Sequence, residues 1–308
     1  MARTPLLALM IACQSPPARP QEGMLPVEGG RIWYEVIGTG RGIPLIVLHG
    51  GPGGTDQYLS ALQALGDDRP VVLYDQLGSG RSDRISDTSL MHADRYAREL
   101  DSLRRYLRFA RVNLYGHSWG GALALEYLRS QSSSVASVIL ASPLVRTADW
   151  LADAWQRIAA LPDPIRRAIT EHEKAGTTDA PEYKAAVDVY YRQYVYHAPP
   201  PYPANVDSSD AGLNLPVSDQ MWGRAEFSPS GNLRDFDGTE VLKGLPIPVL
   251  FTAGRFDEVV STTLERYAAM TLHGQVAIFE QSGHFWMVTE PTAYIARIRR
   301  FLRDADRP

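Results

Sequence analysis

A serine flanked by glycines is the candidate nucleophile of this chain. Residues 116–121 read Gly-His-Ser-Trp-Gly-Gly, a G-x-S-x-G pattern centred on Ser118. The apolar, strand-like run 112–115 precedes this pattern, and the helix-forming stretch 120–129 follows it. Between a strand and a helix, such glycines permit the sharp turn that exposes a serine hydroxyl. The pattern therefore predicts acyl-transfer chemistry at Ser118 rather than a serine in an ordinary turn.

A serine nucleophile needs a histidine base and a carboxylate that orients the histidine. The fold that uses G-x-S-x-G places the acid after the serine and the histidine last. Of the seven histidines, His284 fits this order, because it follows the last predicted strand. Asp257 fits as the acid, because it follows the strand-like run 248–253. The plainer interpretations are a helix N-cap for Asp257 and a surface loop for His284, and the intact order favours the catalytic one.

The oxyanion formed during acyl transfer must be stabilised by backbone N–H groups. One donor is expected from Trp119, the residue after the nucleophile. The other is expected from the loop after the run 44–48, which reads His-Gly-Gly-Pro-Gly-Gly over residues 49–54. Glycines let this backbone approach a substrate closely, and Gly51 is the better candidate. His49 is expected to hold the loop by hydrogen bonds rather than to act as a base.

Short apolar runs alternate with amphipathic stretches around these candidate residues. Strand-like runs cover residues 24–27, 31–36, 44–48, 71–74, 112–115, 135–141, 248–253 and 276–279, and helical spacing covers 55–65, 96–107, 120–129, 262–270 and 290–303. This alternation is the signature of an α/β fold, in which helices flank a mostly parallel sheet. Such sheets hold their chemistry in loops at the carboxyl ends of the strands.

The alternation stops near Arg146 and resumes after Asp237. Residues 146–237 are predicted to form a helical cap inserted into a core domain that comprises residues 24–145 and 238–308. The cap contains a tyrosine-rich segment, residues 190–196. We interpret this segment as the packed face of a helix rather than as a binding site.

Composition excludes several classes of protein. The chain has 308 residues, of which 44% are hydrophobic and 21% charged, so it can bury a sizeable core and is not globally disordered. The net charge is −4, so no basic surplus indicates nucleic-acid binding. The single cysteine excludes an intrachain disulfide and a cysteine-based zinc cluster. We expect neither a metal ion nor another cofactor.

Residues 1–23 have the composition of a secretory signal followed by a proline-rich linker. Arg3, an apolar stretch and the sequence Met-Ile-Ala-Cys ending at Cys13 resemble a bacterial lipobox, in which the cysteine is lipidated. This pattern predicts a periplasmic or membrane-anchored lipoprotein. The alternatives are a disordered tail or a true start at Met24, and a cytoplasmic location is the alternative to the anchor. No apolar run approaches the ~20 residues that span a bilayer.

Three motifs together resemble the proline iminopeptidase family of α/β hydrolases. They are His-Gly-Gly-Pro-Gly-Gly at 49–54, Asp-Gln-Leu-Gly-Ser-Gly-Arg-Ser at 75–82, and Gly-His-Ser-Trp-Gly-Gly at 116–121. Segments 181–183, 221–233 and 254–259 are similar to the branch of tricorn-interacting aminopeptidases. The resemblance covers about residues 24–302. It implies an α/β-hydrolase fold with a helical cap, and release of N-terminal residues, often proline, from short peptides.

By this resemblance, the catalytic residues are Ser118, Asp257 and His284, the oxyanion donors are Gly51 and Trp119, and the substrate's α-amino group is bound by Glu226 and Glu258. A carboxylate in a partly dry site distinguishes a free ammonium from a blocked amine, which supports the two glutamates. Their plainer interpretation is that of solvated surface residues. Two departures are Ser79, where many members have cysteine, and the lipobox, because well-known members are cytosolic.

The sequence therefore predicts a serine aminopeptidase that acts on short peptides or amino-acid amides. The closest alternative is an amidase or esterase of small acyl compounds, because the same triad serves all of these and the fold does not fix the substrate. A hydrolase-fold binding protein is less favoured, because every catalytic group is retained. Epoxide hydrolase and dehalogenase chemistry is disfavoured, because those related enzymes place aspartate where Ser118 stands.

Overall fold

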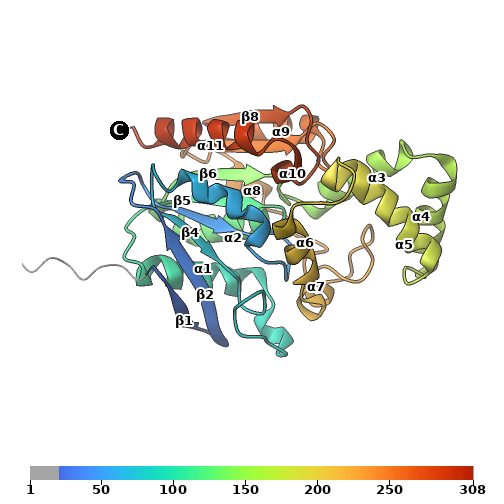
Figure 1. Ribbon diagram of the computed structural model, residues 1–308, viewed down its shortest axis with the longest axis horizontal. Helices are drawn as coiled ribbons and strands as arrows, with labels where there is room; N and C mark the ends of the chain where they lie inside the picture. The colour runs from blue at the N-terminus through green and yellow to red at the C-terminus, as the bar shows by residue number, and fades with distance from the viewer. Residues whose placement is uncertain (1–20, 308) are drawn as a thin grey trace, which may run out of the picture.

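An eight-stranded, mostly parallel sheet forms the centre of the protein (Figure 1). This computed structural model describes residues 21–307. The strands are β1 (Glu22–Val27), β2 (Gly30–Ile37), β3 (Leu45–Leu48), β4 (Val71–Tyr74), β5 (Val112–His117), β6 (Val135–Ala141), β7 (Val249–Gly254) and β8 (Gly274–Phe279). Their order is β1-β2-β4-β3-β5-β6-β7-β8, with β1–β2 and β2–β4 antiparallel and the other pairs parallel. The predicted α/β fold is confirmed.

Helices cover both faces of the sheet. The core helices are η1 (Gln57–Leu65), η2 (Thr88–Leu90), α1 (Ala93–Tyr106), α2 (Trp119–Gln131), η3 (Ser132–Ser134), α8 (Thr239–Leu242), α9 (Ser261–Ala268), α10 (Trp286–Thr289) and α11 (Pro291–Ala305). Helices α1, α2 and α9 pack on one face, and η1, α10 and α11 on the other. In β3, Ile46 and Leu48 face the first group, whereas Leu45 and Val47 face the second. This two-sided burial explains why the central strands are continuous apolar runs.

Two element boundaries differ from those expected. β1 begins at Glu22, although residues up to 23 were expected to form a linker. Glu22 pairs with Glu35 of β2, and its Oε1 accepts a hydrogen bond of 3.1 Å from Trp33 Nε1. These contacts with β2 make β1 start earlier than expected. The helical spacing over residues 55–65 forms the 3₁₀ helix η1, Gln57–Leu65, instead of a full α-helix.

Helices between β6 and α8 form the inserted region. They are α3 (Thr147–Ala159), α4 (Asp163–Ala175), α5 (Pro181–Tyr190), the π-helical turn η4 (Tyr191–Tyr196), α6 (Ala204–Ala211) and α7 (Leu215–Met221). Figure 1 shows α3, α4 and α5 projecting beyond the sheet, with α6 and α7 closer to it. An isolated antiparallel bridge joins Arg146 to Asp237, so the two ends of the insertion lie side by side. This pairing supports our proposal that residues 146–237 are one cap.

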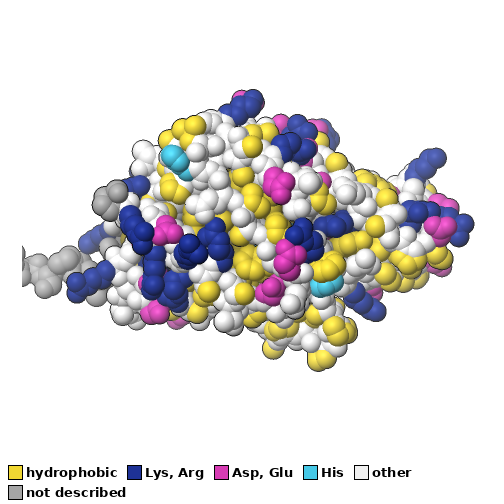
Figure 2. Space-filling view, turned by 90° about the horizontal axis from the view of Figure 1, so that it is seen from above, with side chains coloured by type: hydrophobic (Ala, Val, Ile, Leu, Met, Phe, Trp, Pro, Cys, Tyr) yellow, Lys and Arg dark blue, Asp and Glu magenta, His cyan; other side chains and the backbone are white. Residues whose placement is uncertain are grey.

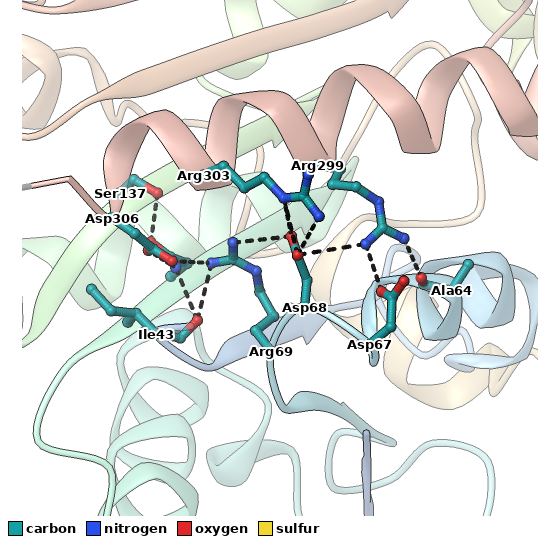
Figure 3. Close-up of polar contacts among 10 residues, drawn as sticks. Ile43, Ala64, Asp67, Asp68, Arg69, Ser137, Arg299, Arg303 and Asp306 are labelled. Atoms are coloured by element: carbon teal, nitrogen blue, oxygen red, sulfur yellow. Dashed lines mark hydrogen bonds and ion pairs between the residues drawn. The ribbon is translucent and has the colours of Figure 1, made fainter. Parts of the chain in front are cut away.

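Ion pairs fasten α11 to the loop before β4 (Figure 3). Arg303 and Arg299 of α11 pair with Asp68 and Asp67, at 2.6 and 2.5 Å. The buried Arg69 reaches Asp306 beyond α11, at 3.0 Å. Figure 2 shows basic side chains gathered over part of the face seen from above, and the arginines of α11 line a surface groove. Because Arg299 and Arg303 pair with aspartates of the loop before β4, these two arginines have a structural role.

Within residues 21–307, no helix is both long and apolar enough to cross a membrane. Cys13 and the predicted lipobox lie outside the described residues. The predicted lipid tether therefore stays a prediction from the sequence.

Candidate active site

Ser118 lies in a sharp turn between β5 and α2. Its φ of 54° and ψ of −121° form a backbone conformation that non-glycine residues rarely adopt. The glycines of the motif make the turn possible. A Cβ at Gly116 would lie 2.3 Å from the carbonyl oxygen of Gly120, and a Cβ at Gly120 would lie 2.1 Å from that of Leu48. A side chain at either glycine would therefore displace the backbone that presents Ser118.

Asp257 and His284 follow the neighbouring strands β7 and β8. His284 Nδ1 lies 2.9 Å from Asp257 Oδ1. The other oxygen, Oδ2, accepts a hydrogen bond of 2.5 Å from Ser142 Oγ, and the backbone N–H of Val259 donates to Oδ1 at 3.2 Å. These contacts fix the carboxylate. An ionised carboxylate can only accept, so Nδ1 of His284 carries the proton and Nε2 is free to act as a base.

The electrostatics of this pair favour proton abstraction. Burial alone would lower the pKa of His284, but the negative charges of Asp257, Glu258 and Glu226 hold that pKa above its ordinary value. Burial alone would raise the pKa of Asp257, but the charge and hydrogen bond of His284 hold it below its ordinary value. The pair thus combines an ionised carboxylate with a histidine that is a stronger base than in water.

Ser118 and His284 line one cavity of about 380 Å³ between the sheet and the cap. This volume falls in the range of small-molecule sites. Among the described residues, no direct hydrogen bond joins Ser118 Oγ to His284. Catalytic hydrogen bonds of free enzymes are often long and tighten when substrate binds, so the shared cavity is the relevant geometry.

The loop after β3 passes over the N-terminus of α2. A Cβ at Gly50 would lie only 3.2 Å from Ser118 Cβ, and the φ of Gly51 is 120°, a value that favours glycine. Gly51 and Trp119 both line the cavity. Trp119 is the first residue of α2, so its N–H has no partner within the helix. The two expected oxyanion donors therefore belong to backbones beside Ser118.

Hydrogen bonds of His49 and Gln76 hold this loop. His49 Nε2 accepts from the backbone N–H of Gln76 at 3.0 Å, and Nδ1 lies 2.8 Å from the carbonyl oxygen of Gly50. The side-chain amide of Gln76 donates to the His49 carbonyl and accepts from Trp119 Nε1 at 2.9 Å. Burial lowers the pKa of His49, which keeps it neutral. The prediction that His49 positions the loop is confirmed.

Glu226 and Glu258 both line the cavity, and the charge of Glu226 acts on Glu258. Glu258 is buried, and its Oε2 lies 3.8 Å from His284 Nδ1. Burial raises the pKa of both carboxyls, that of Glu258 to about 7. The hydroxyl of Tyr190, in the core of the cap, acts on the Glu258 carboxyl and opposes this rise in its pKa. In the described part of the chain, neither pairs with an arginine or lysine, so these glutamates are not ordinary solvated surface residues.

A buried relay, which the sequence reasoning missed, connects the oxyanion loop to the loop of His284. The Tyr58 hydroxyl accepts a hydrogen bond of 2.7 Å from the backbone N–H of Gly50 and lies 2.9 Å from His117 Nδ1. His117 Nε2 lies 3.1 Å from the carbonyl oxygen of His284. Burial lowers the pKa of His117 to about 3, so this histidine is neutral. Tyr58 therefore donates to Nδ1, and Nε2–H of His117 donates to the His284 carbonyl.

The tyrosine-rich segment of the cap contributes to the cavity, contrary to expectation. Tyr190 and Tyr194 pack in the hydrophobic core of the cap, as predicted. Tyr191 and Tyr196, however, line the cavity, so the prediction of a packed face alone is wrong for these two residues. The π-helical turn that begins at Tyr191 breaks the helical spacing on which that prediction depended. The density of tyrosines at this break was the available signal.

The same cap segment pairs with the backbone of the His284 loop. The N–H of His284 donates to the carbonyl oxygen of Tyr194, and that of Phe285 to Val195, both at 2.9 Å. A Cβ at Gly283 would lie 2.6 Å from the Tyr194 carbonyl oxygen, so only glycine allows this approach. The position of His284 thus depends on the cap as well as on β8.

Comparison with known proteins places this architecture in a family. A family model described as the alpha/beta hydrolase fold matches residues 43–291. A proline iminopeptidase of Heyndrickxia coagulans is 40% identical over 283 residues, which cover 91% of this chain and 98% of that protein. A proline iminopeptidase of Levilactobacillus brevis is 35% identical over 294 residues, with 93% and 97% covered. The chain belongs to the proline iminopeptidase family of α/β hydrolases.

Solved structures agree with this family membership. A proline iminopeptidase of Mycobacterium smegmatis aligns with a TM-score of 0.85 and 28% identity, covering 92% of this chain and 98% of that one. The structure of VinJ aligns with a TM-score of 0.87 and 28% identity, covering 94% and 100%. The resemblance drawn from the sequence motifs is confirmed, and as a member of this family the protein is a hydrolase.

Proposed function

We propose that this protein is a serine aminopeptidase that releases an N-terminal residue, proline foremost, from short peptides. The observation that carries the proposal is a pair of carboxylates, Glu226 and Glu258, in the same cavity as Ser118 and His284. An aminopeptidase must bind a free ammonium at a short, fixed distance from the carbonyl that it attacks. The names of the relatives from Heyndrickxia coagulans and Levilactobacillus brevis support proline as the first residue.

Catalysis begins when Ser118 Oγ attacks the first peptide carbonyl. His284 Nε2 takes the serine proton, and Asp257 stabilises the resulting imidazolium through the hydrogen bond at Nδ1. The backbone N–H groups of Gly51 and Trp119 stabilise the oxyanion. The C–N bond then breaks, and the leaving amine takes the proton from His284. Water hydrolyses the acyl-enzyme by the same steps, which restores the serine.

Glu226 and Glu258 bind the ammonium of the substrate in this mechanism. Both glutamates line the cavity, so their carboxylates can accept hydrogen bonds from a substrate ammonium. Trp150, Tyr191 and Trp222 line the same cavity and offer apolar walls to a pyrrolidine ring. Because the pKa of Glu258 is about 7, part of the free enzyme carries a protonated Glu258 near neutral pH. Ammonium binding favours the ionised form and so releases a proton to solvent.

A substrate panel tests the proposal. Proline, alanine and phenylalanine naphthylamides are assayed beside their N-blocked forms and beside simple acetate esters. The wild-type enzyme should cleave the free-amino compounds, with proline preferred, and not the blocked ones. Glu226→Gln and Glu258→Gln should each lower kcat/KM on free-amino substrates by roughly thirty-fold or more, as expected when one partner of a buried charge pair is removed. Both variants should retain ester hydrolysis.

Glu182→Gln is the matched control, because Glu182 is an exposed glutamate on helix α5 of the cap. It should behave as wild type on every compound. Equal cleavage of blocked and free substrates by the wild type would replace the aminopeptidase with an amidase or esterase. Equal losses on esters and peptides in both glutamine variants would assign the glutamates a structural role. Metal chelators should leave the activity unchanged.

We propose, from the sequence alone, that Cys13 is lipidated and tethers the enzyme to a membrane surface. Cys13→Ser should move the protein from the membrane fraction to the soluble fraction without changing its activity on soluble peptides. Wild-type protein in the soluble fraction, with residue 24 at its N-terminus, would contradict the tether.

A further inference from the structure

The reaction cavity has a second acidic region besides the glutamate pair, and we call it the α6 end. Helices α6 and α7 and the segment between them line this end with Ser209, Asp210, Leu213 and Ser218. Tyr196 of η4 lies beside them. Asp210 is solvent-exposed at its rim, so it can meet a ligand without a rearrangement of the fold.

Contacts with the core domain fix this end on the side of the oxyanion loop. Thr55 Oγ1, just after the glycine-rich loop, donates to Ser209 Oγ at 2.9 Å. Val206 of α6 is fully buried in the cluster that contains the apolar side chains of η1. In Figure 1, α6 accordingly lies between the sheet and the projecting helices α3 to α5. Asp210 is therefore carried by a helix that is anchored beside the catalytic loops.

The electrostatic environment separates Asp210 from the glutamate pair. Desolvation of the carboxyl on its protein side raises the pKa of Asp210, the hydrogen bond from Tyr196 opposes this rise, and the charge of Asp207 one turn earlier on α6 adds to it. The charges of His284 and Glu226 both act on Glu258. The cavity thus contains Asp210 as well as the glutamate pair, and Ser118 lines the same cavity.

The chemistry of Asp210 suits a cation. The hydroxyl of Tyr196 donates to Asp210 Oδ2 at 2.5 Å, and the ring of Tyr196 stacks on that of Tyr202 with centroids 4.0 Å apart. Within residues 21–307, no arginine or lysine forms an ion pair with Asp210, although the charge of Arg192 reaches Tyr202. A carboxylate beside aromatic rings attracts ammonium and guanidinium groups and repels carboxylates.

We propose that this end of the cavity is a leaving-group subsite that selects peptides with lysine or arginine as their second residue. This rests on the proposed function, in which the glutamate pair holds the substrate's amino end and Ser118 attacks the first carbonyl. The α6 end, which adjoins the oxyanion loop through Thr55 and Ser209, is where we place the second residue. Asp210 attracts a basic side chain there and disfavours an acidic one. It also disfavours the free carboxylate of a dipeptide.

The test compares proline-arginine-amide, proline-glutamine-amide and proline-glutamate-amide at low ionic strength. The wild type should prefer the arginine peptide over the glutamate peptide by roughly three- to tenfold in kcat/KM, the scale of a partly exposed ion pair. Salt should reduce this preference, because it screens exposed charges. Asp210→Asn should abolish the preference, and Asp210→Lys should reverse it toward the glutamate peptide.

Proline naphthylamide, whose leaving group is neutral, separates the subsite from the chemistry. Its kcat/KM is the reference by which the peptide values of each Asp210 variant are divided, and Asp163→Asn on helix α4 should match wild type on every peptide. An unchanged arginine-to-glutamate ratio in Asp210→Asn and Asp210→Lys would overturn the subsite while leaving the aminopeptidase intact. Failure of the wild type to cleave proline naphthylamide would instead overturn the proposed function itself.

Discussion

Replacement of Glu258 by glutamine should move the acid limb of the pH–rate profile to lower pH. Glu258 Oε2 lies 3.8 Å from His284 Nδ1, so the negative charge stabilises protonated His284. Two unit charges 3.8 Å apart interact by about 4 kcal/mol at an effective dielectric constant of about 20, which equals about three pKa units. Glutamine has nearly the same shape and no charge, so the substitution removes this stabilisation.

The observable shift is smaller than this upper value, because Glu258 and His284 titrate in the same range. Burial raises the pKa of Glu258 to about 7, so the carboxyl is only about half ionised near neutral pH. We therefore expect the pKa that governs kcat/KM to fall by about one to two units. His284 must be neutral to accept the serine proton, so a lower pKa of His284 preserves activity at lower pH.

An acetate ester is the appropriate substrate for this measurement, because it has no amino group for Glu258 to bind. Its kcat/KM is measured across the acidic and neutral range for wild type and variant. Glu226→Gln should give a smaller shift in the same direction, because its charge has a smaller effect on His284 than that of Glu258. The exposed Glu182→Gln should give none. An acid limb in Glu258→Gln that stays in place, or moves to higher pH, would refute the reasoning.

The other variants probe the nucleophile, the relay and the turn. Ser118→Ala should abolish turnover of peptides and esters alike, and a fluorophosphonate should label only the wild type, at this residue, as mass spectrometry of digests will show. Tyr58→Phe should leave two buried polar partners unsatisfied, at about 1–3 kcal/mol each, and a melting temperature equal to that of wild type would contradict the relay. Gly120→Ala should destabilise the fold far more than Gly176→Ala in urea unfolding. The new Cβ at Gly120 would lie 2.1 Å from the Leu48 carbonyl, whereas at Gly176 nothing lies within 4 Å and only the left-handed backbone costs about 1–2 kcal/mol.

The core of the fold was predictable because its signals are local. Each parallel strand is a short apolar run between glycines and prolines, and each covering helix has one apolar face. The motif around Ser118 combines both signals within ten residues, so strand, turn and helix could be read together. His49 could be predicted to hold the oxyanion loop by hydrogen bonds, because it directly precedes the flexible glycines of that loop. Local pattern sufficed wherever neighbours in sequence are also neighbours in space.

The cap side of the cavity was not predictable in the same way. Tyr191 and Tyr196 line the cavity. They belong to a π-helical turn, and the 3.6-residue periodicity used in the prediction assumes a regular α-helix. Asp210 lies on a short helix with little apolar periodicity in its sequence, and the position of that helix depends on contacts with η1, such as the hydrogen bond from Asn205 to Ser60. The link from Tyr58 through His117 joins two loops that are distant in sequence. Such tertiary contacts produce no periodic pattern in the sequence from which they could be predicted.

The backbone pairing between η4 and the loop of His284 has a consequence for how this protein can be recombined. The carbonyls of Tyr194 and Val195 accept hydrogen bonds from the N–H groups of His284 and Phe285. In a chimera joined at Arg146 and Asp237, the cap of the other parent would therefore position the catalytic histidine of this protein. Such a graft should transfer specificity intact only when residues 281–286 come from the same donor. The cap and residues 281–286 therefore form one discontinuous unit, and crossover points that preserve it must lie outside both segments.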